Sequence, residues 1–205
     1  GYTPLEKVYA FRPIPDSLTS EEAKFIIGAQ ANLWTEYMYD DRQVQYMLHP
    51  RLCALSEVLW SDSTSRDLTG FYKRIQSHQA FLDRFSWNYS TSWMQPAIQI
   101  AGGAEIPSLK LSLKAKVPAT ISTAFTNGSE LPIFETYRKP LSISTSGTLF
   151  VRSVAGGKEK EVKYPFEFSK STGAKVELVV PGSRSYANPG STLTDGITGV
   201  YPWTG

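Results

Sequence analysis

The sequence has little cysteine: Cys53 is the single thiol in 205 residues. One thiol cannot form an internal disulfide framework, and the sequence holds no Cys/His cluster of the kind that binds zinc. Cys53 lies inside a strong helical pattern, so we expect it to pack as a small apolar side chain. The sequence therefore predicts neither a disulfide-stabilised fold nor a metal site.

A large excess of one charge is also missing. Lys and Arg number 21 and Asp and Glu number 19, which gives a net charge of +2 with both signs interspersed along the chain. The basic stripe that is typical of a nucleic-acid-binding protein is therefore absent. We predict that the protein has no nucleic-acid partner.

Long apolar runs are missing as well. No run approaches the roughly 20 residues that a membrane-spanning helix needs, so the sequence predicts no membrane span. A secretory signal is absent too, but the sequence begins with Gly1 instead of methionine. Such a start indicates a cut or processed end, so the missing signal carries little information about the compartment.

What is present changes in character near residue 90. Residues 1–89 carry helical patterns, whereas the sequence from residue 97 onward is rich in Ser, Thr, Gly, Pro and Val in alternating order. Residues 90–96 are typical of a connection. We expect an α+β protein with one domain over 1–89, a second over 97–168 and the start of a third over 169–205.

The first part predicts a short helix, a strand and further helices. Hydroxyl and carboxylate residues cap a helix over 20–24, and an unbroken apolar run follows over 25–33. Such a run is typical of a strand covered on both faces in a parallel sheet. Apolar residues then recur at helical spacing up to residue 59, and Pro50 should kink or split this helix. The same spacing over 67–85 predicts a further helix. A lone strand lacks partners for its backbone groups, so we expect a piece of a larger α/β fold.

The second part predicts short antiparallel strands. Apolar and polar residues alternate in several runs: Leu109, Leu111 and Leu113; Ile121, Thr123 and Phe125; Leu141 and Ile143; Leu149, Val151 and Val154. Turns are expected at Asn127-Gly128, Ser146-Gly147 and Gly156-Gly157, the last two with hairpin spacing and Gly128 with positive φ. The pattern predicts a small antiparallel β-sandwich over 97–168 and another strand over 174–180.

The stretch GAQANLWTEY over 28–37 ends in an unusual set of side chains. Trp34 and Glu36 are two residues apart, so a strand directs both to the same side. At the carboxyl end of a parallel barrel strand, that side is the mouth where active sites form. A tryptophan ring suits the apolar face of a sugar, and a carboxylate accepts hydrogen bonds from its hydroxyls. The residues alone leave a plain alternative open, a core tryptophan beside a solvated charge.

Three motifs around this stretch resemble one enzyme family. They are G-x-Q-x-x-L-W-T-E over 28–36, Y-M-x-x-P-R over 46–51 and A-L-S-E-V-L-W over 54–60. In this order they are similar to the carboxyl-terminal end of the catalytic barrel of β-N-acetylhexosaminidases, glycoside hydrolase family 20. The resemblance covers residues 1–89 and implies the last strand and helices of a (β/α)8 barrel.

The resemblance implies a role for both candidate site residues. In that family the tryptophan matching Trp34 forms part of the aromatic wall of the sugar pocket, and the glutamate matching Glu36 hydrogen-bonds the outer hydroxyls of the terminal sugar. The family cleaves with an adjacent Asp-Glu pair and the substrate's own acetamido group, without a metal or organic cofactor, which departs from the usual scheme of two carboxylates. No Asp-Glu dipeptide occurs in this sequence. We therefore predict substrate-binding residues, no catalytic residue and an inactive chain.

Further expectations follow from the resemblance and from the residues themselves. The parent enzyme would act on glycans that end in N-acetylhexosamine, in a secreted or periplasmic location. Arg51 and Glu57, on the helix after the site, are expected to be structural, and His49 and His78 are expected to pack or to face solvent. The apolar run over 25–33 has no neighbouring strands, so we expect the chain to self-associate there.

The second part carries two weaker resemblances. Residues 125–154 resemble the small β domain that follows many such barrels, which implies a structural or spacer role. The matching positions are Phe125, Gly128, Ser129, Pro132, Tyr137 and Pro140. The tail over 186–203 contains Leu-Thr-Asp-Gly at 193–196 and is similar to the opening of discoidin-like carbohydrate-binding domains. For this Asp-Gly we expect a turn and no functional metal site.

Two other interpretations stay open. The chain is either a non-catalytic glycan-binding or spacer module with a helical docking remnant, or a protein–protein scaffold whose exposed barrel face another chain covers. An upstream Asp-Glu pair at a strand end favours the enzyme. Sugar binding by the β part alone favours the module, and a dimer that buries residues 25–33 favours the scaffold.

Overall fold

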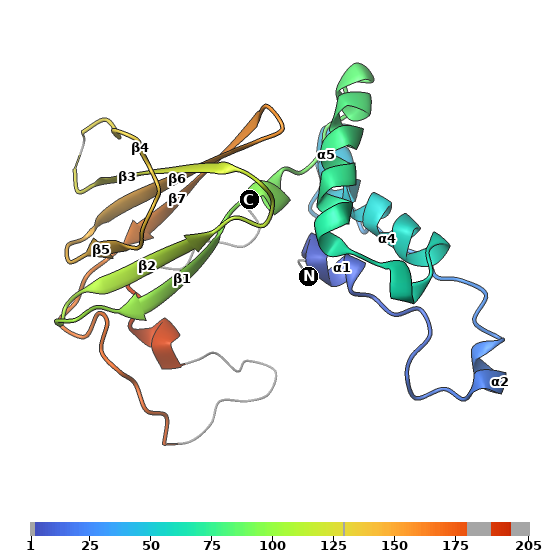
Figure 1. Ribbon diagram of the computed structural model, residues 1–205, viewed down its shortest axis with the longest axis horizontal. Coiled ribbons are helices and arrows are strands. Elements are labelled where there is room, and N and C mark those ends of the chain that lie inside the picture. The colour runs from blue at the N-terminus through green and yellow to red at the C-terminus, as the bar shows by residue number, and fades with distance from the viewer. Residues whose placement is uncertain (1–2, 129, 180–189, 198–205) are drawn as a thin grey trace. The chain divides into compact units, whose positions relative to one another are not determined.

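The computed structural model describes residues 3–128, 130–179 and 190–197. The chain divides into two compact units, Gly1–Trp93 and Met94–Gly205. Figure 1 shows that the first unit holds the longer helices and the second holds the strands. Within the described ranges no helix combines the length and the apolar character that crossing a membrane requires.

The first unit is helical, and side-chain caps explain where several helices begin. Its helices are α1 (Leu5–Tyr9), α2 (Ser20–Ala23), α3 (Asp41–Leu48), α4 (Arg51–Trp60) and α5 (Leu68–Arg84), with 3₁₀ turns η1 (Ser63–Ser65) and, at the end of the unit, η2 (Ser92–Met94). Thr19 forms a capping box at α2. Asp40 and Asp67 accept hydrogen bonds from backbone N–H groups in the first turns of α3 and α5.

An aromatic core joins these helices. Tyr9 of α1 stacks on Phe71 of α5 with ring centroids 4.7 Å apart, and Tyr72 stacks on Trp93 at 5.7 Å. Val58 of α4 is buried in the same unit. Because α5 is amphipathic, one stripe of its side chains enters the core while the other faces solvent.

The helices expected in the first unit are confirmed. The predicted helices over 20–24 and 67–85 correspond to α2 and α5. Pro50 separates α3 from α4, since it has no backbone N–H to continue the hydrogen bonds of α3. Cys53 is partly buried on α4, and burial raises the pKa of its thiol, as expected for an inert packing residue.

The strand predicted over 25–33 is not formed, and this expectation was wrong for the chain as it stands. The segment has no regular secondary structure, and Phe25 and Ile27 are 83% and 100% exposed. A buried-type strand forms only when neighbouring strands satisfy its N–H and C=O groups. The described part of the first unit contains no strand that does so.

The second unit contains two antiparallel sheets. Its strands are β1 (Ala97–Gly102), β2 (Leu109–Lys114), β3 (Thr120–Thr126), β4 (Glu135–Thr136), β5 (Leu141–Ile143), β6 (Gly147–Ala155) and β7 (Lys158–Phe166), followed by the 3₁₀ turn η4 (Gly190–Leu193). One sheet has the order β1-β2-β5 and the other has the order β4-β3-β6-β7. Figure 1 shows them as two separate layers of arrows.

Both sheets contribute to one hydrophobic core. Leu111 of β2, Leu149 of β6 and Phe166 of β7 are almost completely buried in it. The alternation seen in the sequence is the cause, because every second residue of a strand faces the same side. The buried Ser153 hydroxyl donates to the backbone oxygen of Met94, which satisfies a polar group inside this core.

The two turns expected to form hairpins differ in the structure. Gly156 and Gly157 have φ of 55° and 75° and join β6 to β7, so the predicted hairpin is confirmed. Ser146-Gly147 is not a hairpin turn, because β5 pairs with β2 while β6 lies in the other sheet. Turn residues mark a change of direction but do not choose the partner of the next strand.

Gly128 also departs from expectation. Its φ lies outside the positive range, and a Cβ added there meets nothing within 4 Å. The Asn-Gly dipeptide occurs in a bend, as predicted, but the chain reaches this bend without a left-handed residue. The expectation of positive φ at Gly128 was therefore wrong.

The difference between these glycines gives a stability prediction. Replacing Gly157 by alanine should destabilise the second unit by roughly 1 kcal/mol, because an L residue is strained at φ of 75°. Urea unfolding of the second unit measures the effect. The control is Gly128→Ala, which should leave stability unchanged or slightly raised. Equal effects of the two substitutions would contradict the assignment of the β6–β7 turn.

The last described residues of the second unit pack on the rest of that unit without forming the predicted strand. Residues 174–179 have no strand structure, and residue 180 lies outside the described residues. The loop at 193–196 is a turn as expected: the Gly196 carbonyl accepts from Glu167 N–H at 2.7 Å, and Asp195 accepts from Ile197 N–H. The rest of the discoidin-like stretch, residues 186–189 and 198–203, lies outside the described residues.

Candidate functional site

The two predicted substrate-binding residues lie on an exposed connection of the first unit. Trp34 is 77% exposed, and Glu36 is exposed as well. A turn begins between them, since the N–H of Met38 donates to the carbonyl of Thr35 at 3.0 Å. No hydrogen bond or ion pair joins the Glu36 side chain to another described residue, so its oxygens are open to a ligand.

The end of this connection is attached to the start of α3. The backbone N–H of Tyr39 donates to Oε1 of Gln43 at 3.1 Å, and the N–H of Gln43 donates to Oδ1 of Asp40 at 2.7 Å. The two bonds form a reciprocal cap at the amino-terminal end of α3, which fixes where the chain enters the helix. Asp40 is the N-cap residue of α3, and aspartate is a common residue type at that position. The sequence did not reveal the role of Gln43, whose only signal was its spacing of four residues from Tyr39.

α3 and α4 are held in place by polar contacts made by Arg51 and Glu57. Arg51 donates to the backbone oxygens of Thr3 and Met47 at 2.7 and 2.8 Å. Glu57 accepts from the Tyr9 hydroxyl at 2.7 Å and pairs with Arg74. Both side chains therefore contact other parts of the first unit, as the expectation of a structural role requires.

The protonation preferences of this network agree with an ion pair. Partial burial acts to raise the pKa of Glu57, but hydrogen bonds from Arg74 and Tyr9 outweigh it and lower the pKa. Burial and the hydrogen bond to Glu57 raise the pKa of Tyr9. Glu57 is therefore ionised and occupied with its partners, which does not suit a proton donor in catalysis.

No metal centre accompanies the candidate site. Over residues 3–128, 130–179 and 190–197, no group of three or more His, Cys, Asp or Glu side chains is arranged to hold a metal ion. A hollow of about 430 Å³ lies between α4 and α5 of the first unit. Neither Trp34 nor Glu36 lines it, so this hollow is not the predicted sugar site.

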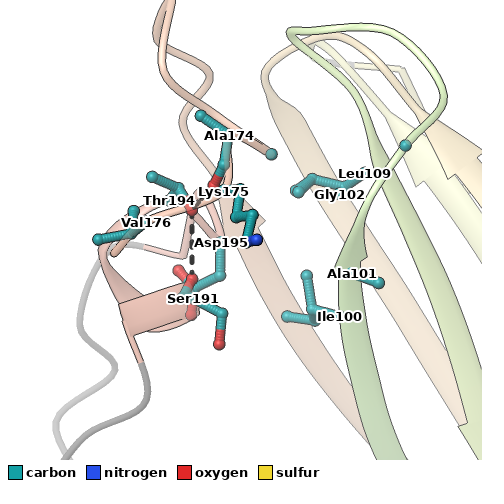
Figure 2. A pocket seen from close by; sticks show the side chains of 12 residues that line it. Ile100, Ala101, Gly102, Leu109, Ala174, Lys175, Val176, Ser191, Thr194 and Asp195 are labelled. Atoms are coloured by element: carbon teal, nitrogen blue, oxygen red, sulfur yellow. Dashed lines mark hydrogen bonds between the residues drawn. The ribbon is translucent and has the colours of Figure 1, made fainter. Parts of the chain in front are cut away.

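The second unit has a hollow of its own, of about 460 Å³. Figure 2 shows Ile100 and Leu109 from the strands on one side of it, and Thr194 and Asp195 from the segment that follows η4 on the other. Its lining residues include no aromatic side chain. It therefore lacks the flat apolar surface that a sugar ring stacks on.

Comparison with known proteins identifies the relationship of the first unit. Residues 1–63 match the family described as "Glycosyl hydrolase family 20, catalytic domain". The chain is 33% identical to a β-hexosaminidase of Porphyromonas gingivalis over 98% of its own length and 25% of that protein. It is 34% identical to a β-N-acetylhexosaminidase of Cellulomonas fimi over 47% of the chain and 20% of that protein. The human β-hexosaminidase subunit beta is 34% identical over 36% of the chain and 13% of that protein.

The chain is thus similar to glycoside hydrolases. Within that class, the matches confirm the resemblance of the chain to part of a family 20 hexosaminidase. The chain spans about a quarter of the length of the Porphyromonas gingivalis relative and less of the other two. Trp34 and Glu36 both fall inside the matched residues 1–63.

Proposed function

We propose that this chain is part of a β-N-acetylhexosaminidase that removes terminal β-linked N-acetylhexosamine from glycans by substrate-assisted, retaining hydrolysis. In this proposal the first unit is the end of a (β/α)8 barrel and the second unit is a small β-sandwich that serves as a spacer. Trp34 and Glu36 bind the sugar, and the cleaving groups lie in a part of the enzyme that this chain does not contain.

One observation carries the proposal: Trp34 and Glu36 are exposed two residues apart, within the stretch that matches the family 20 catalytic domain. The Trp34 ring is 77% open to solvent, so its face is available to stack on a ligand. The apolar face of a pyranose is a suitable cover. The carboxylate beside it offers only acceptors, which match sugar hydroxyls.

The position of the pair in the chain supports a binding role over a catalytic one. A general acid is usually held in place by a partner group, and Glu36 is exposed with no hydrogen bond or ion pair to another described residue. A solvent-exposed carboxylate is instead suited to accept hydrogen bonds from the sugar hydroxyls. The anchored start of α3 then limits how far the pair can move from the sugar.

A location outside the cytoplasm belongs to this proposal, since glycans with terminal N-acetylhexosamine are found on secreted and surface molecules. We propose self-association only for the isolated chain, in which apolar side chains over 25–33 are open to solvent. In the complete enzyme, the neighbouring barrel strands would cover the same side chains.

A substitution at Glu36 tests the binding role. In the full-length enzyme, Glu36→Gln should raise the inhibition constant of N-acetylglucosamine by about tenfold or more. The reason is that a charge-assisted hydrogen bond contributes about 1.5–3 kcal/mol to binding. The control is Glu21→Gln on α2, which removes an exposed charge paired with Lys24 and should change inhibition little. Equal inhibition constants for the Glu36 variant and the unaltered enzyme would refute the assignment.

A further inference from the structure

His49 is a buried histidine without a hydrogen-bond partner for its ring. It lies between α3 and α4, directly before Pro50, and its side chain is only 6% exposed. Neither Nδ1 nor Nε2 has a partner among the described residues. A neutral imidazole tolerates such a place at moderate cost, but an imidazolium there lacks both solvent and an acceptor.

The backbone around His49 joins the parts of the first unit that meet at this point. The N–H of His49 donates to the Gln45 carbonyl of α3 at 2.9 Å, and the N–H of Ser90 donates to the His49 carbonyl at 3.0 Å. The His49 ring lies against the Trp87 ring, with centroids 5.0 Å apart. Residues 87–90, which follow α5, are therefore held against the α3–α4 junction at His49.

Asn88 strengthens the same junction through both its backbone and its side chain. Its N–H donates to Oε1 of Gln45 at 2.8 Å, and its side-chain amide donates to the Arg42 carbonyl at 2.8 Å. Together with the contacts of His49, these bonds connect α3 to the chain beyond α5. We call the contacts of His49 and Asn88 with α3 and residues 87–90 the His49 junction.

The charges near His49 do not favour its protonation. Backbone groups of Gln45 and Ser90 bond to the backbone of His49, and the Trp87 ring lies against its ring. From α5, the charge that acts on His49 is that of His78. Burial lowers the pKa of His49, and His78 lowers it further. No carboxylate of the described chain contributes to this shift, so an added proton finds no compensating charge.

We propose that protonation of His49 opens the His49 junction, so that the first unit loses stability in mild acid. The physical reason is that an imidazolium must return to water, and it reaches water only if the contacts with Trp87 and Ser90 separate. Opening releases residues 87–90 from α3 and from His49. The buried histidine thereby makes the folding of this unit sensitive to pH.

Opening of the His49 junction should also affect sugar binding at Trp34 and Glu36, a consequence that depends on the proposed function. Gln43 of α3 holds Tyr39 at the end of the segment that carries Trp34 and Glu36. If α3 is no longer held at its far end, the anchor of that segment is weakened. Acid then lowers sugar affinity through a residue that does not touch the sugar.

The direction and size of the effect follow from proton linkage. Because the folded state lowers the pKa of His49, the unfolded state binds the proton more tightly. Stability is therefore fully present above the unfolded value of about pH 6.5 and is lost as the pH falls toward the folded value. In that window the unfolding equilibrium constant should rise by up to about tenfold per pH unit.

The chain has two histidines, which makes the test direct. In the 205-residue chain with His78→Gln, His49 is the remaining imidazole, and its proton resonances report its titration by nuclear magnetic resonance. We expect no titration down to well below pH 6.5 while the unit stays folded. An ordinary titration near pH 6.5 in the folded protein would overturn the proposal.

Urea unfolding supplies the second measurement, followed through the amide signals of α4 between about pH 7.5 and 5.5, a range that brackets the unfolded histidine value. The His78→Gln protein should unfold more readily as the pH falls, and adding His49→Phe, which keeps an aromatic ring against Trp87, should remove that dependence. An equal pH dependence in both proteins contradicts the proposal. Neither readout uses sugar or enzyme activity, so failure here leaves the proposed function standing. Conversely, failure of the sugar tests leaves this result unaffected.

Discussion

The purified 205-residue chain should not hydrolyse a chromogenic N-acetylglucosaminide at any pH. The reason is that the proposed chemistry needs an adjacent Asp-Glu pair, and the sequence contains none. In the proposed function Trp34 and Glu36 provide binding alone, and binding a sugar without stabilising the transition state does not accelerate its cleavage. The assay compares release of the chromophore by the chain with release by the full-length enzyme.

Hydrolytic activity of the chain is expected to be undetectable, because the chain lacks both the general acid and the group that orients the nucleophile. The control is the full-length enzyme at equal concentration, which should turn over the substrate under the same conditions. Turnover by the pure chain, retained after a second purification step, would show that this sequence holds its own catalytic groups. The proposed separation of sugar binding from cleavage would then be wrong.

Replacing Trp34 by alanine in the full-length enzyme should lower kcat/KM by about a hundredfold, or about 3 kcal/mol. An aromatic anchor that the bound sugar covers should contribute several times more than an average contact, because its ring then excludes water from the sugar face. Steady-state kinetics with the chromogenic substrate measure the change. Circular dichroism of the same preparation checks that the variant is folded.

The matched control for this substitution is Trp60→Ala. Trp60 ends α4 and is 92% exposed in the chain, so its replacement removes an indole of similar exposure from the same unit. It is not proposed to touch the sugar, and the effect of its loss on kcat/KM should stay within a few-fold. Equal losses for the two variants would indicate general destabilisation and not a lost sugar contact.

Local sequence signals determined the helices well. Thr19, Asp40 and Asp67 cap helices through bonds to residues two or three positions away, so the cause and its effect lie in the same short stretch. The Gly156-Gly157 turn is equally local, because two residues with positive φ dictate a tight hairpin. Such features are predictable from sequence.

Pairing between distant segments was less predictable. The apolar run over 25–33 has the composition of a buried strand, but a strand exists only with neighbours, and the described part of the first unit provides none. In the second unit, β5 joins β2 instead of β6, although a turn-like pair separates β5 from β6. Composition predicts that a segment is extended. It does not predict which segment it joins.

The candidate site also has features that could be predicted from the sequence and features that could not. That Trp34 and Glu36 form an unusual pair was readable from their types and spacing, and their open surroundings agree with a binding role. The attachment of Tyr39 through Gln43 and the unpartnered ring of His49 were not readable, because both depend on where side chains meet in space. The sequence pattern predicted only that His49 would pack or face solvent.

A crystal structure of the full-length enzyme with N-acetylglucosamine bound would test the sugar-binding roles of Trp34 and Glu36 most directly. We predict that the apolar face of the sugar lies on the Trp34 ring at van der Waals distance, about 4 Å. We also predict that the carboxylate of Glu36 accepts hydrogen bonds from the outer hydroxyls at about 2.5–3.0 Å. A sugar bound elsewhere, with Trp34 and Glu36 both out of contact with it, would contradict both roles.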